Sequence, residues 1–270
     1  MMARLLYFFT FISMILQYFT SSKAPDISFD LYLSQVGSSV MMDKKKKLKG
    51  ALFLNMLIVF FESYALFQAF FNADGGFNWH FLQYYCHIAN ICTLISSLLV
   101  ALELMKELQS NMRERTSYIS RVLKFASTTA MVFSFFITVL VLVPFDSFGK
   151  GRLYLLSGYY FFEHLLCPLL SFLTITVFGD YADFGRKESL IAVVPTFLYA
   201  SVMFLLNALK IMEAPFPFFS VYSQSWYVSL LWFTALVAFS FGCAWLLVGA
   251  ARIVRIRTVV GTDVFRASDM

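Results

Sequence analysis

Residues 125–144 read FASTTAMVFSFFITVLVLVP, twenty consecutive positions without a charged side chain. A helix needs about 20 apolar residues to cross the roughly 30 Å of hydrocarbon in a bilayer. This stretch therefore predicts a transmembrane helix. Five other stretches meet the same criterion: residues 51–72, 79–105, 153–177, 189–212 and 227–251.

The composition of the whole chain agrees with a membrane protein. Of its 270 residues, 60% are hydrophobic and 14% are charged, whereas soluble domains carry about 25% charged residues. The loops between the predicted spans are short, so none of them holds a soluble domain. We expect an all-α, polytopic bundle of six transmembrane helices over residues 44–257, followed by a cytoplasmic tail over residues 258–270.

The N-terminal residues 1–43 are open to several interpretations. Residues 5–20 are apolar but short for a span, and they are typical of a signal-peptide core, an additional N-terminal helix or an interfacial helix. A further interpretation is that translation starts at Met41 or Met42, directly before the lysines at 44–47. Residues 1–40 would then be an extension that the core does not need.

Positive charges predict the orientation, because loops rich in Lys and Arg stay in the cytoplasm. Sixteen of them lie before the first span, between the second and third, after the fourth and after the sixth, and Lys124 is counted among those before the third span. The other side carries Lys150, Arg152 and Lys210. Both termini of the core are therefore expected in the cytoplasm. Topology and anionic lipid account for the net charge of +5, so the expected partner is membrane lipid and not nucleic acid.

Cysteine usage and motif content limit the classes of function. The four cysteines, Cys86, Cys92, Cys167 and Cys243, all fall inside predicted spans, so we expect no disulfide framework. The sequence has no glycine-rich phosphate loop, zinc spacing or nucleotide motif, and we expect neither a cofactor nor a metal. The remaining candidates for chemistry lie within the membrane or at its faces.

Two predicted spans carry reactive or titratable side chains in an apolar setting, which usually marks a working site in a membrane protein. In the fourth span a polar stripe with helical spacing contains Tyr160 and His164, and in the second a similar stripe contains Cys86 and Asn90, with His87 on its flank. The complete stripes are Ser157, Tyr160, His164, Cys167, Ser171 and Thr174, and Gln83, Cys86, Asn90, Thr93 and Ser97. A rise of about 1.5 Å per residue places Cys86 and His164 at similar depths. We predict that the two side chains meet.

A cysteine beside a histidine is suited to nucleophilic catalysis. The thiolate attacks, and the imidazole accepts the thiol proton and later protonates the leaving group. Cys86 and His164 are therefore the predicted catalytic pair. The plainer alternative is that Cys86 packs and His164 makes a hydrogen bond between helices. The predicted supporting residues are His87, Asn90, Glu62, Tyr160 and Asn207.

Several side chains have two interpretations. Glu62 lies near the middle of the first span, where it would orient an imidazole or relay a proton, unless it is simply a protonated carboxyl bonded within the bundle. Asn207 is expected to donate a hydrogen bond to an oxyanion or to link two helices. Glu163 lies about 100° from His164 around the helix and is expected to snorkel or to pair elsewhere. Residues 215–219, PFPFF, cannot continue a helix and are expected to cap the mouth of the bundle.

Four motifs carry a resemblance to a known family. The segment QYYCHIANI at residues 83–91 resembles the YFT..SN region of a superfamily of six-helix membrane proteins, which includes the androgen-induced hydrolases of fatty-acid esters of hydroxy fatty acids. His164 followed by Pro168 is similar to a second motif. Residues 195–199 and 215–219 resemble two later signatures, so the similarity covers roughly residues 45–255.

This resemblance implies roles for particular positions. Cys86 stands at the position of the nucleophilic Thr of the hydrolases, and His164 at that of its His partner. The pair Cys86–His87 is also similar to a Cys-His motif in a related acyltransferase branch, and Ala89 replaces the usual Ser. The implied activity is hydrolysis of a lipid ester or acyl transfer.

Other classes of function stay open at this stage. The protein would be non-enzymatic if it were a carrier for a small lipid or a proton-coupled solute, or a structural partner of another membrane protein. A third possibility is a metal or proton site formed by His80 and His87 with Glu62. A metal site would require three or more converging ligands.

Overall fold

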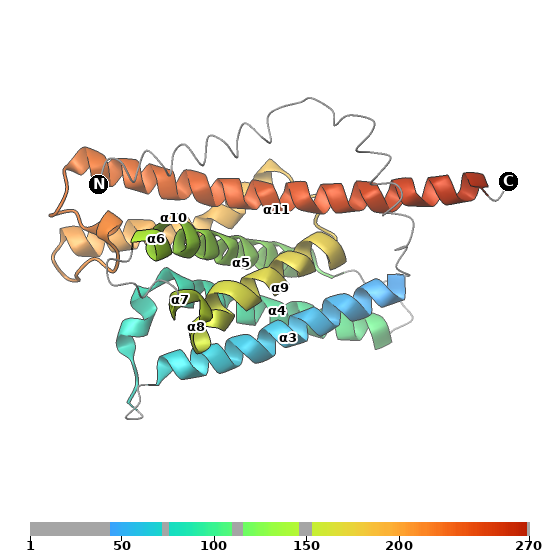
Figure 1. The fold of residues 1–270 in the computed structure, drawn as a ribbon, viewed down its shortest axis with the longest axis horizontal. Coiled ribbons are helices and arrows are strands. Elements are labelled where there is room, and N and C mark those ends of the chain that lie inside the picture. Colours follow the sequence, from blue (N-terminus) through green and yellow to red (C-terminus); the bar gives the residue numbers. More distant parts are fainter. Residues whose placement is uncertain (1–43, 72–75, 110–115, 146–152, 269–270) are drawn as a thin grey trace.

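The computed structural model describes residues 44–71, 76–109, 116–145 and 153–268. The expectations for residues 1–43, and the loop charges Lys150 and Arg152, lie outside the described residues. The described chain contains six helices that are long and apolar enough to cross a membrane, and they run roughly alongside one another (Figure 1). The predicted all-α fold with six spans is confirmed, as expected for a multi-pass membrane protein.

The first three spans are nearly continuous. Their elements are α3 (Lys44–Phe70), η1 (Trp79–Gln83) leading into α4 (Tyr85–Gln109), and α5 (Tyr118–Ile137) followed by the π-helical turn η2 (Thr138–Leu142) and α6 (Val143–Phe145).

The fourth span is interrupted, whereas the fifth and sixth are regular. The fourth consists of α7 (Leu153–Leu156), α8 (Tyr159–Phe161), the π-helical turn η3 (Phe162–Leu166), α9 (Cys167–Leu173) and a second π-helical turn, η4 (Thr174–Phe178). The fifth is α10 (Arg186–Ala208), and η5 (Pro217–Phe219) precedes the sixth, α11 (Trp226–Ser268). α11 continues beyond the predicted end at residue 251 and extends past the other helices (Figure 1).

α5 occupies the centre of the bundle, where it contacts α4, α9, α10 and α11. Its residues 126–130, ASTTA, are all buried, and small side chains of this kind let neighbouring helices approach closely. The Ser127 hydroxyl donates to the Lys124 carbonyl at 3.0 Å, and the Thr129 hydroxyl to that of Phe125 at 2.9 Å. These bonds satisfy the hydroxyl donors within the helix, so polar side chains are tolerated in the core.

α5 begins seven residues earlier than the predicted span. The reason is an N-terminal cap, because the Ser117 hydroxyl accepts a hydrogen bond from the Ser120 backbone N–H at 3.2 Å and thereby satisfies a free donor of the first turn. The Glu103 carboxylate accepts three more bonds, from the Ser117 N–H at 2.8 Å, the Ser117 hydroxyl at 2.9 Å and the Ser120 hydroxyl at 2.7 Å. Lys124 consequently lies inside the helix and is fully buried. Its predicted place in a cytoplasmic loop was wrong.

Two of the π-helical turns end two residues before a proline. Pro168 has no N–H, and its ring clashes with the carbonyl four residues earlier, that of His164. The helix accommodates this clash by widening into η3. Pro144 stands in the same relation to η2. The wider turns carry Glu163 and His164 in η3 and Thr138 in η2.

The outer face of α3 illustrates how the bundle meets lipid. Phe53, Phe60 and Phe67 recur every seven residues and are 62%, 66% and 60% exposed, while Ile58 and Ala65 on the other side are buried. Helices in lipid gain little from burying apolar groups against one another, so large apolar residues remain on the outside.

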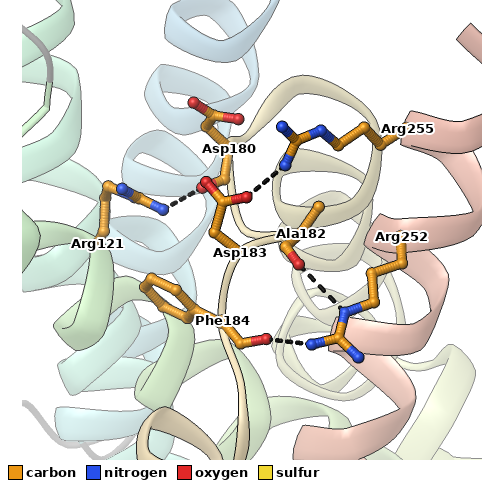
Figure 2. A network of polar contacts seen from close by, with 7 residues as sticks. All are labelled: Arg121, Asp180, Ala182, Asp183, Phe184, Arg252 and Arg255. Atoms are coloured by element: carbon orange, nitrogen blue, oxygen red, sulfur yellow. Dashed lines mark hydrogen bonds and ion pairs between the residues drawn. The ribbon is translucent and has the colours of Figure 1, made fainter. Parts of the chain in front are cut away.

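The turn at residues 179–185, between η4 and α10, is held by arginines from α11 (Figure 2). The Arg252 guanidinium donates to the Ala182 carbonyl at 3.1 Å and to the Phe184 carbonyl at 2.7 Å. Arg255 forms an ion pair with Asp183. The backbone of this turn is therefore tied to the last helix.

A third arginine approaches the same turn from α5. The Arg121 guanidinium donates to the Asp180 carbonyl, and it lies 5.7 Å from the centre of the Tyr181 ring and 4.9 Å from that of Phe184. Cation–π contacts of this kind stabilise a desolvated guanidinium. The 179–185 turn thus joins the third, fourth and sixth spans at one end of the bundle.

The contacts of Arg252 and Arg255 lead to a stability prediction. Arg252→Ala removes two charge-assisted hydrogen bonds to backbone carbonyls, each typically worth about 1.5–3 kcal/mol, so we expect a lower unfolding temperature in detergent. Arg255→Ala serves as the matched control, because an exposed ion pair contributes little. Thermal unfolding of the two variants should show the larger decrease for Arg252→Ala. Equal decreases would contradict this assignment.

Candidate functional site

A cavity of about 890 Å³ lies among α4, α5, η2, α10, α11 and the 215–219 segment. We call it the large cavity. Its size falls within the usual range for small-molecule sites, roughly 300–1,000 Å³. Most of its lining is aromatic or aliphatic, and the polar groups in its wall include Cys86, His87, Tyr160 and His164. The two predicted catalytic side chains therefore share one cavity.

Cys86 and His87 in the cavity wall form a polar group with Glu163, which does not itself line the cavity; we call this group the Cys–His–Glu cluster. The His87 Nδ1 lies 3.0 Å from the Glu163 Oε1, and a ligand atom from each of the three side chains lies within 4.8 Å of the other two. An ionised carboxylate only accepts hydrogen bonds, so Nδ1 then carries the proton and Nε2 is the free base.

Packing fixes the orientation of the His87 imidazole. Its ring stacks on Phe81 with centroids 4.1 Å apart and an interplanar angle of 12°, and the Tyr84 ring meets its edge at 5.9 Å. Both His87 and Glu163 are buried. A hydrogen bond on one ring nitrogen and an aromatic ring on one face leave little freedom to the imidazole.

The start of α4 determines the surroundings of the Cys86 thiol. α4 begins at Tyr85, so Cys86 and His87 occupy the first turn, where backbone N–H groups have no partner within the helix. The backbone N–H groups of Cys86 and His87 interact with the Cys86 sulfur. The start of α4 thus places main-chain N–H donors beside the thiol, which itself lines the large cavity.

His164 lies in a separate polar group at the same cavity. Its Nδ1 is 3.4 Å from the Thr138 hydroxyl, and its ring stacks on Tyr160 with centroids 6.0 Å apart. Within the described part of the chain, no hydrogen bond joins Cys86 to His164. Direct contact between these two side chains therefore stays a prediction, and His87 is the imidazole that the structure brings into the Cys–His–Glu cluster.

The other predicted supporting residues divide into two sets. Tyr160 lines the large cavity, and Asn90, one helical turn after His87, is buried beside Glu163. Glu62 is fully buried but does not line the cavity. Asn207 also lies outside the lining, where its side chain donates to the Met212 carbonyl at 3.2 Å and accepts from the Val221 N–H at 2.9 Å. Asn207 thus holds the segment that leads to the sixth span.

The segment at residues 215–219 forms one wall of the large cavity, as the prediction of a cap suggested. Its rings pack tightly, with Phe216 stacked on Phe218 at 5.2 Å and Phe218 against Trp232 at 5.6 Å. Tyr199 on α10, which also lines the cavity, donates to the Gln83 carbonyl at 2.6 Å. Rigid aromatic and proline residues therefore shape the cavity on this side.

The partner of Glu163 was missed in the sequence, where its side chain was expected to snorkel or to pair with an unnamed residue. The available signal was Pro168, because a proline inside an apolar run widens the preceding turn and changes where its side chains point. Glu163 and His164 consequently face different neighbours, His87 on α4 and Thr138 on η2.

The Cys–His–Glu cluster also contains the side-chain types that bind zinc. A thiolate, an imidazole and a carboxylate in one place, beside an open cavity, match the three protein ligands of a catalytic zinc site. The predicted alternative set of His80, His87 and Glu62 is not assembled in this way. His80 is exposed and bonded to Gln83 at 3.0 Å.

Comparison of the chain with protein-family models, with curated proteins and with solved structures found no match.

Proposed function

We propose that this multi-pass membrane protein acts on the ester bond of an acyl lipid, as a hydrolase or an acyltransferase, with Cys86 as the nucleophile. The observation that carries the proposal is the Cys–His–Glu cluster at the wall of a largely apolar cavity. A nucleophile, a base and a group that orients the base are the constellation of covalent acyl-transfer sites. The sequence resemblance to the six-helix ester hydrolases and acyltransferases supports the same reaction class.

The proposed first step forms a thioester. His87, oriented by Glu163, takes the proton of the Cys86 thiol, and the sulfur attacks the ester carbonyl carbon. The carbon–oxygen bond to the leaving alcohol breaks, and the imidazolium returns the proton to that alcohol. The acyl group is then bound to Cys86 through a C–S bond.

The second step releases the acyl group. His87 takes a proton from water or from an acceptor alcohol, whose oxygen attacks the thioester carbonyl and expels the Cys86 thiolate. Transfer of the proton to the sulfur restores the starting state. Water yields a free acid, and an alcohol yields a new ester.

His164 is the alternative base, and it is the one implied by the family resemblance. In the proposed arrangement His164 instead supplies a hydrogen-bond donor near the reacting carbonyl, from the opposite side of the cavity, and Thr138 orients the His164 ring through Nδ1. Donors aimed at the developing oxyanion commonly provide a large part of catalysis in acyl transfer. The two assignments differ in which histidine is needed for formation of the thioester.

The cavity lining indicates the substrate class. Aromatic and aliphatic side chains such as Phe133, Ile137 and Leu236 form most of the wall, which suits a long apolar acyl chain arriving from the bilayer. The exposed Phe side chains of α3 face the lipid. A substrate dissolved in the bilayer would therefore lie next to the bundle.

The proposed function is tested with purified protein in detergent. A thioester or activated-ester probe with a long acyl chain should acylate the protein, and short-chain analogues should react more slowly because they bury less apolar surface. Metal analysis of the same sample distinguishes the zinc alternative, in which stoichiometric zinc would occupy the thiolate and block acylation. Protein without zinc that resists acylation would contradict the proposal.

We also propose that the ends of the six-helix core lie in the cytoplasm. Without Lys124, fifteen basic residues remain on the side of the core termini, against three on the other, and this excess supports the orientation. Fluorescent-protein fusion after residue 270 should give fluorescent cells, and alkaline phosphatase inserted near residue 148 should be active. The reverse pattern would contradict the orientation.

A further inference from the structure

Between the large cavity and the other end of the bundle lie three buried ionisable side chains, of which the ester chemistry uses only Glu163. Glu62 on α3 and Lys124 on α5 are fully buried, and Glu163 is 1% exposed. The charged groups that act on Glu62 are Glu163 and Lys124. Charges in an apolar interior are costly unless they are paired, so these three groups require an explanation.

The fourth span gives the order of these groups along the bundle. Glu163 is followed on the same helix by Cys167 and then Ser171, each about one turn or 6 Å further from the large cavity. Cys167 interacts with Glu62, which places Glu62 next after Glu163. The Lys124 ammonium lies 3.4 Å from the Ser171 hydroxyl. The order is therefore Glu163, Glu62 and Lys124.

Polar side chains surround the ammonium of Lys124. It donates to the Ser97 hydroxyl on α4 at 2.7 Å and to the Ser171 hydroxyl on α9 at the longer distance. The ionisable groups that act on it are Glu62 and Cys167. Lys124 is therefore bonded to two neighbouring helices, α4 and α9, and the carboxylate that acts on it is that of Glu62.

A second cavity, of about 350 Å³, lies at the end of the bundle that carries the 179–185 turn. We call it the small cavity. Its lining includes Asn55, Arg121 and Thr174, which are about one helical turn from Lys124 or Ser171 on α5 and the fourth span, and two turns from Glu62 on α3. The buried line of charges thus runs from the large cavity to within about one turn of the small cavity.

Charge counting indicates that this line holds an exchangeable proton. Two carboxylates and one ammonium leave one excess negative charge in a region from which the bilayer excludes counterions. Neither carboxyl oxygen of Glu62 has a hydrogen-bond partner among the described residues, so a proton on Glu62 or Glu163 removes the unpaired charge. His87 and Asn90 face Glu163 on its other side.

We propose that Glu163, Glu62 and Lys124 form a proton-transfer route between the large and the small cavity. A proton enters at the His87–Glu163 pair and passes to the Glu62 carboxylate. Lys124 releases a proton toward the small cavity, and Glu62 reprotonates the Lys124 amine. Each group returns to its starting state, so one proton crosses the bundle with no other change. The route does not depend on ester chemistry at Cys86.

The test uses the full chain in liposomes that enclose a pH-sensitive dye. After an external acid step, with the membrane potential held at zero by valinomycin and equal potassium, wild-type protein should acidify the interior at least tenfold faster than protein-free liposomes. Glu62→Gln and Lys124→Met should each return the rate to that of protein-free liposomes. Glu213→Gln, at an exposed position away from the line, is the matched control and should keep the wild-type rate.

Two results would overturn the proposal. One is wild-type liposomes that acidify no faster than protein-free ones, and the other is a Glu62→Gln variant, eluting as wild type in gel filtration, that keeps the full rate. Should Glu62→Gln fail to fold, infrared spectra of the wild type decide the matter, because the route requires a protonated carboxyl whose C=O band shifts in D₂O. Absence of that band would contradict the route, and ester turnover measured in parallel reports on Cys86 separately.

Discussion

Replacement of Cys86 by alanine should abolish acylation of the purified protein by a long-chain ester probe. The sulfur is the only atom that bonds to the acyl group in the proposed mechanism, and removal of a nucleophile typically lowers turnover by about 10³-fold or more. Intact-protein mass spectrometry would show the added acyl mass in the wild type and none in Cys86→Ala. Turnover of the ester, followed by release of the acid, should fall in parallel.

Cys92 provides the matched control for this experiment. It lies on the same helix six residues away, and its thiol is free and exposed. A probe that merely reacts with accessible thiols would modify Cys92, so Cys92→Ala should remove any background and keep the acylation at Cys86. Acylation that survives in Cys86→Ala but not in Cys92→Ala would identify Cys92 as the reacting group and refute the proposed nucleophile.

Glu163→Gln should reduce ester turnover by about 10³-fold while leaving the fold intact. The amide has the same shape, but its NH₂ group donates a hydrogen bond to the His87 Nδ1, which puts the ring proton on Nε2 and removes the base. In serine proteases the equivalent Asp→Asn change lowers kcat by about 10⁴-fold for this reason. Steady-state kinetics should show the loss in kcat, with KM nearly unchanged.

The controls for Glu163→Gln separate the two candidate bases. Glu213→Gln, at an exposed position, should keep wild-type activity. If His87 is the base, His164→Ala should still form the acyl-enzyme, although slowly. Wild-type turnover in Glu163→Gln combined with no acylation in His164→Ala would reverse the assignment and make His164 the base.

The spans and their polar positions were predictable because the bilayer imposes a simple rule on length and polarity. Cys86, His87 and His164 were recognised as unusual in an apolar setting, and they do line one cavity. Segment 215–219 was recognised as unable to continue a helix. These features depend on residue type and local spacing, which the sequence contains directly.

The errors concern places where a local interaction moves a boundary or a face. Lys124 was assigned to a loop because the cap formed by Ser117 and Glu103 depends on a contact between two spans, and that contact is not visible in a hydropathy pattern. The partner of Glu163 was missed because regular helical spacing does not hold through the π-helical turn η3. Contacts between helices decided both outcomes.

The π-helical turn η3 divides the fourth span into two blocks with different phases. A single extra residue in a helix rotates everything that follows by about 100° relative to the regular spacing. The block at Glu163 and His164 therefore presents Glu163 to His87 and His164 to the large cavity, and the following block presents Cys167 to Glu62 and Ser171 to Lys124. Deletion of one residue between Phe162 and Leu166 would bring these two blocks into phase. A single deletion would therefore be enough to break the alignment between the residues at the large cavity and the buried charges.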